Sequence, residues 1–213
     1  MSIKSPQDGG GIKMEKNDNL RNAGREYGLT FSRDRSYLIA KKRIYKARKC
    51  PVYECLINTS WKEKGLANIL LSRKQPDNNI IFGAYLVDTY CLGLKNTFCN
   101  VGFTLSEYEN DLKSKIYRDD DPIDCPVSLI HQIIYGAIEY AANLGFKPQK
   151  DFNMSKYVLE KQSEIEESIP VEFGKDGKPF YISGPYDNTD SIIEQLKEKL
   201  GEGNFHFLIG DQI

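Results

Sequence analysis

The segment from Cys125 to Phe152 has the start, the apolar face and the end of one long helix. Asp124 can cap the first turn, and Pro126 follows at a position where a missing backbone N–H costs nothing. Gly145 supplies a left-handed residue after the last turn, and Pro148 prevents continuation. Apolar residues recur between these signals at steps of three and four: Ile130, Ile133, Ile134, Ala137, Tyr140, Ala141 and Leu144. The sequence therefore predicts a helix over residues 127–144 with one face against a core.

His131 and Glu139 stand two turns apart beside this apolar face. Gly136 lies between them, where glycine costs about 1 kcal/mol relative to alanine. Glycine inside a helix usually allows another element to pack closely against it, so we expect another element to cross at Gly136. We also expect the His131 ring to be at least partly buried, and a buried imidazole needs a hydrogen-bond partner. The sequence offers Glu139, Asp88 and Asp151 as partners.

Two apolar runs that precede this helix predict an antiparallel hairpin. Leu66–Ser72 and Ile80–Tyr90 are separated by residues 75–79, QPDNN, which is a strong turn sequence. The second run is almost continuously apolar, as is typical of a central strand, and Gly83 indicates a bulge or a close approach within it. Val52–Ile57 alternates and predicts a further strand.

Further helices are expected over residues 106–116, behind a capping box formed by Thr104 and Glu107, and over residues 155–167 and 190–200. Asp176-Gly177 predicts a hairpin turn between strands at 171–174 and 179–183, and residues 205–209 are expected to form a last short strand. From Tyr37 onwards, ahead of Val52–Ile57, the chain is also expected to be strand-like. Strands and helices are partly segregated, so we expect an α+β fold with an antiparallel sheet packed by helices.

The length of 213 residues suits one domain with an extension. Residues 1–34 are expected to form a flexible polar and basic arm, with room for a short helix near residues 15–27, and residues 35–213 the globular domain. No apolar run approaches the roughly 20 residues that span a membrane, and the start of the chain lacks the apolar core of a secretory signal. The cysteines number five without a paired CxxC pattern, which favours a reducing, cytoplasmic setting: Cys50, Cys55, Cys91, Cys99 and Cys125.

The net charge of −1 is unevenly distributed along the chain. Residues 1–50 carry 13 basic and 5 acidic side chains, a net charge of +8, and the remaining 163 residues carry −9. Within the first part, Arg33–Lys49 holds eight basic side chains, one acid and the tyrosines Tyr37 and Tyr45. Lys and Arg neutralise phosphates and tyrosines stack on bases.

This pattern predicts an accessory or binding protein whose basic segment contacts RNA, DNA or an acidic protein surface. A solvated edge strand or helix is the alternative that needs no ligand, because lysines at an exposed strand edge also block aggregation. The candidate contact residues are Arg35, Lys41, Lys42, Arg43, Lys46, Arg48 and Lys49.

Asp88, His131 and Glu139 form a second candidate site, that of a metal-dependent hydrolase or nuclease. Glu54 and Asp151 extend the set of oxygen ligands, but none of these residues has the diagnostic spacing of a known metal motif. In the alternative in which Asp88 has no catalytic or metal-binding role, it caps the turn that follows its strand. A zinc site is a further alternative, with a loose C-x4-C spacing and the ligands Cys50, Cys55, Cys125 and His131. The sequence leaves the metal and any cofactor undetermined.

Several short motifs recur in one order along the chain: ECLIN, KGLANILLSR, D..CLG.K, HQIIYGAIEYA..LGF.P..DF and FG.DGKP. Together they resemble an uncharacterised bacterial protein family over about residues 52–209. The resemblance implies no activity, so it assigns no catalytic residue.

Overall fold

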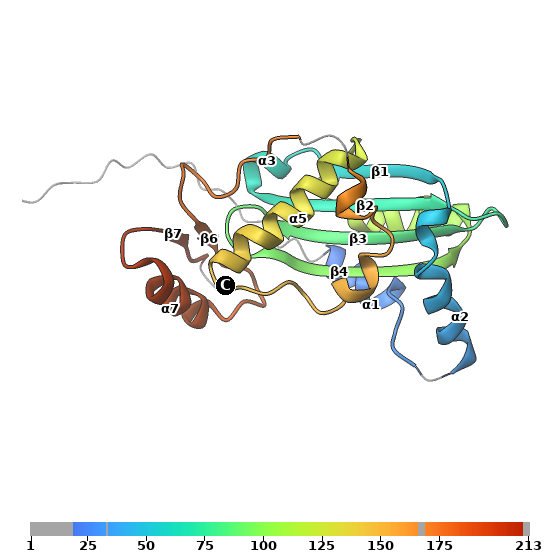
Figure 1. The fold of residues 1–213 in the computed structure, drawn as a ribbon, viewed down its shortest axis with the longest axis horizontal. Coiled ribbons are helices and arrows are strands. Elements are labelled where there is room, and N and C mark those ends of the chain that lie inside the picture. Colours follow the sequence, from blue (N-terminus) through green and yellow to red (C-terminus); the bar gives the residue numbers. More distant parts are fainter. Residues whose placement is uncertain (1–18, 33, 166–168, 211–213) are drawn as a thin grey trace, which may run out of the picture.

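Five antiparallel strands form the main sheet of the computed structural model, which describes residues 19–32, 34–165 and 169–210. The strands lie in the order β4-β3-β2-β1-β5 (Figure 1). Their bounds are β1 Val52–Asn58, β2 Leu66–Lys74, β3 Ile80–Asp88, β4 Gly93–Phe103 and β5 Pro122–Asp124. The fold is a single α+β domain, as the sequence predicts.

The β2–β3 hairpin is confirmed. Its register runs without interruption from Leu66 opposite Asp88 to Lys74 opposite Ile80, and every residue of β3 is buried. Gly83 marks a close approach and not a bulge, because the register on either side of it is regular. A side chain on Gly83 would collide with the phenol oxygen of Tyr85. Burial on both faces explains why the sequence of β3 is apolar without alternation.

The strand β4 was not predicted from the sequence. It pairs with β3 along its length, with irregularities opposite Ile80–Phe82 and Leu86–Val87. Its sequence, GLKNTFCNVGF, interrupts the apolar positions with lysine, asparagine and glycine, so the alternation typical of a strand is lost. Residues 93–103 are a strand because they pair with the buried strand β3.

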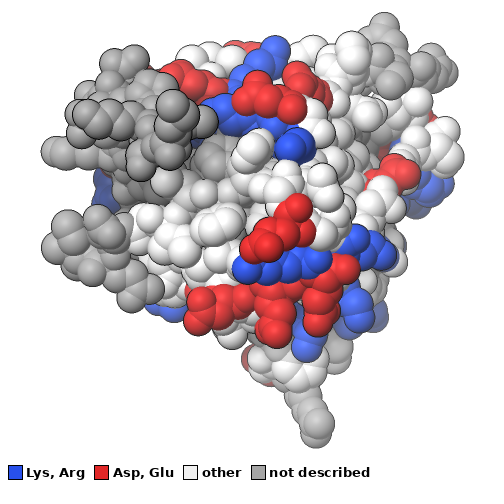
Figure 2. Space-filling view, turned by 90° about the vertical axis from the view of Figure 1, so that its left-hand side faces the viewer, with Lys and Arg blue, Asp and Glu red and all other residues white. Residues whose placement is uncertain are grey.

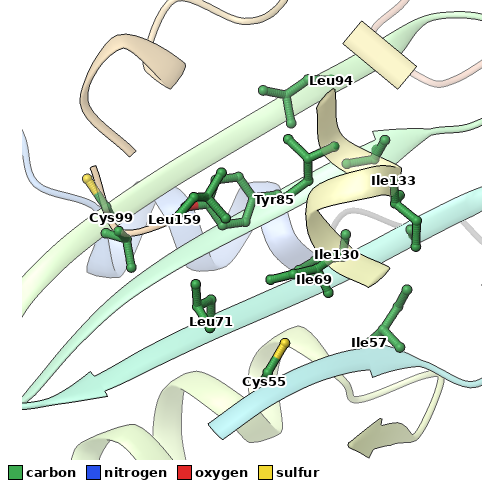
Figure 3. Close-up of a cluster of buried hydrophobic side chains, with 14 of the residues drawn as sticks. Cys55, Ile57, Ile69, Leu71, Tyr85, Leu94, Cys99, Ile130, Ile133 and Leu159 are labelled. Carbon is green, nitrogen blue, oxygen red and sulfur yellow. The ribbon is translucent and has the colours of Figure 1, made fainter. Parts of the chain in front are cut away.

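Helices cover both faces of the sheet (Figure 1). On one face, α5 (Val127–Asn143) and α6 (Phe152–Ser155) lie over a core that includes Ile57, Ile69 and Tyr85 (Figure 3). On the other face, α1 (Asn19–Tyr27), the π-helical η2 (Glu107–Lys113) and α4 (Ser114–Ile116) pack on a second cluster that includes Leu56, Leu70 and Phe82. Alternate side chains along β1 to β4 thus belong to two separate cores.

The helix α5 is confirmed, but its first turn differs from the prediction. Pro126 is the N-cap, with extended backbone and no side-chain cap, whereas Asp124 pairs with Leu56 in β5. Gly145 has the left-handed φ of +89° that ends the helix. The predicted crossing at Gly136 is also confirmed, because a Cβ there would lie 2.5 Å from the ring carbon Cζ of Phe173.

The expected strand-like segment from Tyr37 is wrong, because residues 35–44 form the helix α2 (Arg35–Ile44). Asp34 is its N-cap and accepts a hydrogen bond of 2.8 Å from the backbone N–H of Tyr37. Tyr37 and Ile44, two turns apart, are the buried residues of the helix. A short 3-10 turn, η1 (Ala47–Lys49), leads into β1, and α2 projects from one end of the sheet (Figure 1).

The expected helix over residues 155–167 is wrong in its described part. After α6 the chain passes through turns to the 3-10 helix η3 (Gln162–Glu164). Arg48 and Arg73 reach the backbone carbonyls that a helix would otherwise use, those of Lys156, Val158 and Leu159. Residues 166–168 lie outside the described residues.

The remaining elements follow the predictions in part. The capping box of Thr104 and Glu107 is confirmed, with hydrogen bonds in both directions, and α7 (Thr189–Leu200) begins at the capping residue Asn188. The tight turn at Asp176-Gly177 forms, but residues 171–174 are not a strand. Instead β6 (Phe180–Ile182) pairs in parallel with β7 (His206–Leu208). A one-turn helix, α3 (Trp61–Lys64), joins β1 to β2.

The boundary between arm and domain at residue 34 stays a prediction. Residues 1–18 lie outside the described residues, but α1 is part of the second core, where Leu20 and Ala23 are fully buried. The backbone N–H of Leu29 also bonds to the Cys99 carbonyl of β4, at 3.1 Å. In the described ranges, no helix combines the length and the apolar character needed to cross a membrane.

Candidate nucleic-acid interface and predicted catalytic residues

The exposed basic residues of α2 and its C-terminal extension form one surface, here called the α2 surface: Arg35, Lys42, Arg43, Lys46 and Lys49. Asp34 is the sole acid of residues 34–49. Hydrogen bonds from the Ser36 hydroxyl, the Tyr37 N–H and the Ser32 hydroxyl lower the pKa of Asp34 to about 2. Its carboxylate therefore serves the helix start and does not pair with the basic side chains that follow.

Two of the predicted contact residues have internal roles. Arg48 is half-buried and donates from Nη2 to the Lys156 carbonyl at 2.9 Å, so it holds the turn after α6. Lys41 is also half-buried, with its Nζ 5.7 Å from the centre of the Tyr45 ring. Arg43 stands 3.8 Å from Asp77, and both side chains are about half exposed, so this ion pair restrains it weakly.

Apolar and aromatic side chains are also exposed at this end of the molecule. Phe31 is 78% exposed, Leu38 51%, Ile39 47% and Tyr45 45%. Tyr45 packs edge-on against Tyr157, with 4.5 Å between ring centres, which leaves part of its ring open to solvent. Tyr37 is buried in the core, so of the two tyrosines expected to stack on bases only Tyr45 is accessible.

The opposite end of the molecule has a different charge pattern. Figure 2 shows that, on the face at the left-hand side of Figure 1, Lys and Arg side chains lie beside Asp and Glu side chains. On α7 the sequence alternates in this way, with Glu194, Lys197, Glu198 and Lys199 all exposed. Residues 34–49 hold seven basic side chains and one acid, whereas basic and acidic side chains are mixed on the face in Figure 2.

Asp88 lies at the end of β3 and is 7% exposed. Its Oδ1 accepts hydrogen bonds of 2.9 Å from the backbone N–H groups of Tyr90 and Cys91. Burial raises the pKa of Asp88, and the positive charge of Lys95 and these N–H groups oppose that rise. This geometry is that of a turn cap, the alternative role that the sequence also indicated.

His131 is buried, as predicted, with 2% of its surface exposed. Its Nε2 accepts a hydrogen bond of 3.1 Å from the backbone N–H of Glu160, so none of the three expected carboxylates is the partner of this nitrogen. Burial and the positive charges of Arg73 and Arg48 lower the pKa of His131 to about 4. The ring is thus neutral at pH 7, with its proton on Nδ1, and none of the described residues forms a hydrogen bond with Nδ1.

Asp88, His131 and Glu139 share no hydrogen bond. Glu139 is exposed and stands eight residues after His131, which is about 12 Å along a helix. Glu54 is engaged by the Tyr108 hydroxyl at 2.7 Å and by Lys113 at 2.9 Å. Throughout the described part of the chain, no group of three or more His, Cys, Asp or Glu side chains is arranged to hold a metal ion.

Nothing in the sequence indicated that Arg73, at the end of β2, is buried. Its side chain is 2% exposed and donates to the carbonyls of Val158 and Cys50, at 2.8 and 2.9 Å, and to the Glu160 carboxylate. An arginine after an apolar run is typical of a strand end in solvent, so only the tertiary structure reveals this role.

Comparisons of the chain with protein-family models, with curated proteins and with solved structures find no match. The resemblance to a bacterial family stays a prediction from sequence motifs. Among the described residues, the α2 surface has a clear chemical preference, which is for anions.

Proposed function

We propose that this protein is an accessory or binding protein that contacts nucleic acid through the α2 surface. The observation that carries the proposal is a projecting helix, α2, in which every charged residue is basic. The acid at its N-cap, Asp34, is engaged by the first turn of the helix. Such a surface attracts a polyanion and releases the counterions condensed on it.

The exposed rings beside the charges favour a nucleic acid over other polyanions. Phe31 and Tyr45 are accessible at the same end of the molecule as Arg43 and Lys46. Aromatic rings stack on unpaired bases irrespective of sequence, and each stacked base contributes about 1–3 kcal/mol. Single-stranded segments are therefore the preferred form of the ligand in this proposal.

The hydrolase or nuclease alternative lacks comparable support. It needs Asp88, His131 and Glu139 around one cleft, and in the structure the first caps a turn, the second accepts from a backbone N–H and the third is on the solvent side of α5. An acidic polypeptide is the closer competitor, because it too would bind a basic helix.

The test is fluorescence anisotropy with labelled single-stranded RNA, duplex DNA and polyglutamate at low salt. The triple variant Lys42→Gln/Arg43→Gln/Lys46→Gln should bind RNA at least tenfold more weakly than the wild-type protein. The slope of log K against log salt should become shallower by about 2–3, because three phosphate contacts are lost.

The matched control is Lys62→Gln/Lys197→Gln/Lys199→Gln, which removes the same charge from exposed residues of α3 and α7. It should bind RNA as the wild-type protein does. Equal losses in both variants would show a general effect of net charge and contradict the proposal. Absence of binding to RNA and DNA at low salt would also contradict it, and tighter binding of polyglutamate would assign the surface to an acidic protein.

A further inference from the structure

Two cysteines meet where β1 pairs with β5. The sulfur atoms of Cys55 and Cys125 are 3.6 Å apart, although the residues are 70 positions apart in the sequence. The backbone N–H of Cys125 donates to the Cys55 carbonyl at 3.0 Å, so the strand pairing fixes the two residues opposite each other. A disulfide bond of about 2.05 Å needs the sulfurs to approach by only about 1.5 Å.

The two thiols differ in environment. Cys55 belongs to the core of the α5 face, beside Ile57 and Leu71 (Figure 3), and is 6% exposed. Cys125 is partly exposed and directly precedes Pro126, the N-cap of the 17-residue helix α5. The positive end of the helix dipole stabilises a thiolate at that position.

Either sulfur can donate in the contact between the two thiols, and the Cys125 sulfur also lies 3.6 Å from the Cys55 carbonyl, to which it can donate. A hydrogen bond from the Cys55 thiol lowers the pKa of Cys125, and burial and the negative charge of Asp124 oppose that effect. The same contact and burial raise the pKa of Cys55, whereas the charge of Arg73 opposes the rise. Cys125 is therefore the more acidic thiol of the pair and Cys55 the less acidic one.

We propose that Cys55 and Cys125 form a reversible redox modification site for oxidants of the peroxide class, with Cys125 as the attacked sulfur and Cys55 as the resolving thiol. The proposal does not depend on nucleic-acid binding. It rests on the contact between the sulfurs, on the exposure of one of them and on the helix start beside it.

The chemistry proceeds in two balanced steps. The Cys125 thiolate attacks one peroxide oxygen, an S–O bond forms, the O–O bond breaks, and the departing oxygen takes a proton to leave as water or an alcohol. The Cys55 sulfur then attacks the sulfenic acid, the S–S bond forms, and the hydroxyl leaves as water with the proton of the Cys55 thiol. The two thiols lose two electrons to the peroxide, and a dithiol reductant returns them.

The other cysteines provide internal controls. Cys91 and Cys99 are 0% and 4% exposed, and burial raises the pKa of both thiols, to about 12 for Cys99. Cys50 is partly exposed, as Cys125 is, but it follows a 3-10 turn and does not precede a helix. Cys50 therefore tests whether exposure alone explains the reactivity.

To test this, the full chain is treated with one equivalent of hydrogen peroxide, and the products are mapped by peptide mass spectrometry. We expect a species two hydrogen atoms lighter, with Cys55 and Cys125 joined in one cross-linked peptide pair, and recovery of both thiols after a dithiol reductant. In Cys55→Ser, a sulfenic-acid probe should label Cys125 at least tenfold more than Cys50. In Cys125→Ser, oxidation of Cys55 should be lost, whereas Cys50→Ser should react as the wild-type protein does.

Three results would overturn the proposal: equal labelling of Cys50 and Cys125, a disulfide that includes Cys50 or links two chains, or no change under peroxide. Thermal melts of the reduced variants exclude misfolding as the cause of a lost reaction. If Cys55→Ser or Cys125→Ser fails to fold, the ratio of Cys125 to Cys50 alkylation in the wild-type chain decides, and a ratio near one contradicts the proposal.

Discussion

His131 is held without charge in the structure. The folded chain lowers its pKa to about 4, from an ordinary value of 6.5, through burial and the nearby charges of Arg73 and Arg48. Between those two pH values the unfolded chain binds a proton that the folded chain does not bind. The contribution of the neutral ring to stability is therefore complete above pH 6.5 and is lost as the pH falls towards 4.

We expect His131→Gln to lower the free energy of unfolding at pH 7 by about 1–3 kcal/mol, because the Glu160 N–H loses a well-placed acceptor. Below pH 6.5 the difference between the wild-type protein and this variant should shrink by up to about 1.4 kcal/mol per pH unit, since glutamine does not titrate. Urea unfolding at several pH values measures both effects.

The matched control is His206→Gln, which changes an exposed histidine. As a change at an exposed position, it should alter the free energy of unfolding at pH 7 by no more than about 0.5 kcal/mol. The free energies of unfolding of the wild-type protein and His131→Gln could instead differ by a constant amount from pH 7 to 4.5. In that case the His131 ring is not the group that links stability to pH.

At the scale of elements, the crossing of α5 by the segment around Phe173 depends on one missing side chain. The Phe173 ring lies over Gly136 and stacks on Tyr140, with ring centres 5.8 Å apart. In an isolated helix, alanine at position 136 would be favoured by about 1 kcal/mol. Here the added methyl group would meet the ring at 2.5 Å and force it to move.

We expect Gly136→Ala to lower the free energy of unfolding by about 1–2 kcal/mol, because overpacking outweighs the gain in helix propensity. In a Phe173→Ala background the same change should instead raise it by about 0.5–1 kcal/mol, since only the propensity remains. Denaturant unfolding of the four proteins gives the comparison. The same sign in both backgrounds would show that Phe173 does not constrain this position.

Elements governed by local signals could be predicted from the sequence. The stop of α5 at Gly145, the capping box at Thr104 and the cap at Asn188 all depend on residues within a few positions of each other. Residues 156–161 could not be predicted, because Arg48 and Arg73 donate hydrogen bonds to their carbonyls from positions 85 or more residues earlier in the chain. The strand β4 depends in the same way on its neighbour β3.

In the candidate sites, too, local contacts could be predicted from the sequence and contacts between distant residues could not. Asp88 caps the turn at Tyr90 and Cys91, a local role that the sequence indicated. The contact of His131 with the Glu160 N–H and the pairing of Cys55 with Cys125 join residues 29 and 70 positions apart, for which a single sequence gives no signal. Charge could be predicted because it is a property of composition, so the basic segment was identified even though its conformation was not.

At the scale of the whole molecule, four strands of the sheet lie side by side in chain order, from β1 to β4, and β5 joins β1 from much later in the chain. β2 and β3 are interior strands with pairs on both sides, whereas β5 is a three-residue edge strand. Interior strands open only with the whole domain, and short edges open locally.

We therefore expect the slowest amide hydrogen exchange in β2 and β3, with protection factors close to the global stability, and exchange at least a hundredfold faster in β5. Native-state exchange read by NMR or mass spectrometry tests this. Protection of Ile123 equal to that of Leu70 would show that β5 is part of the same cooperative unit as the sheet interior.

The chain order of the strands also has a consequence for synthesis on the ribosome. Residues 52–103, which form β1 to β4, emerge before residues 127–143, which form α5. At about 5–20 residues per second, the helix is complete roughly 2–8 s after the last of these strands. Throughout that interval the sheet face with Ile69, Leu71 and Tyr85 has no α5 to cover it. The newly made chain therefore passes through a stage in which this apolar sheet face is open to water, and protection from aggregation matters at that stage.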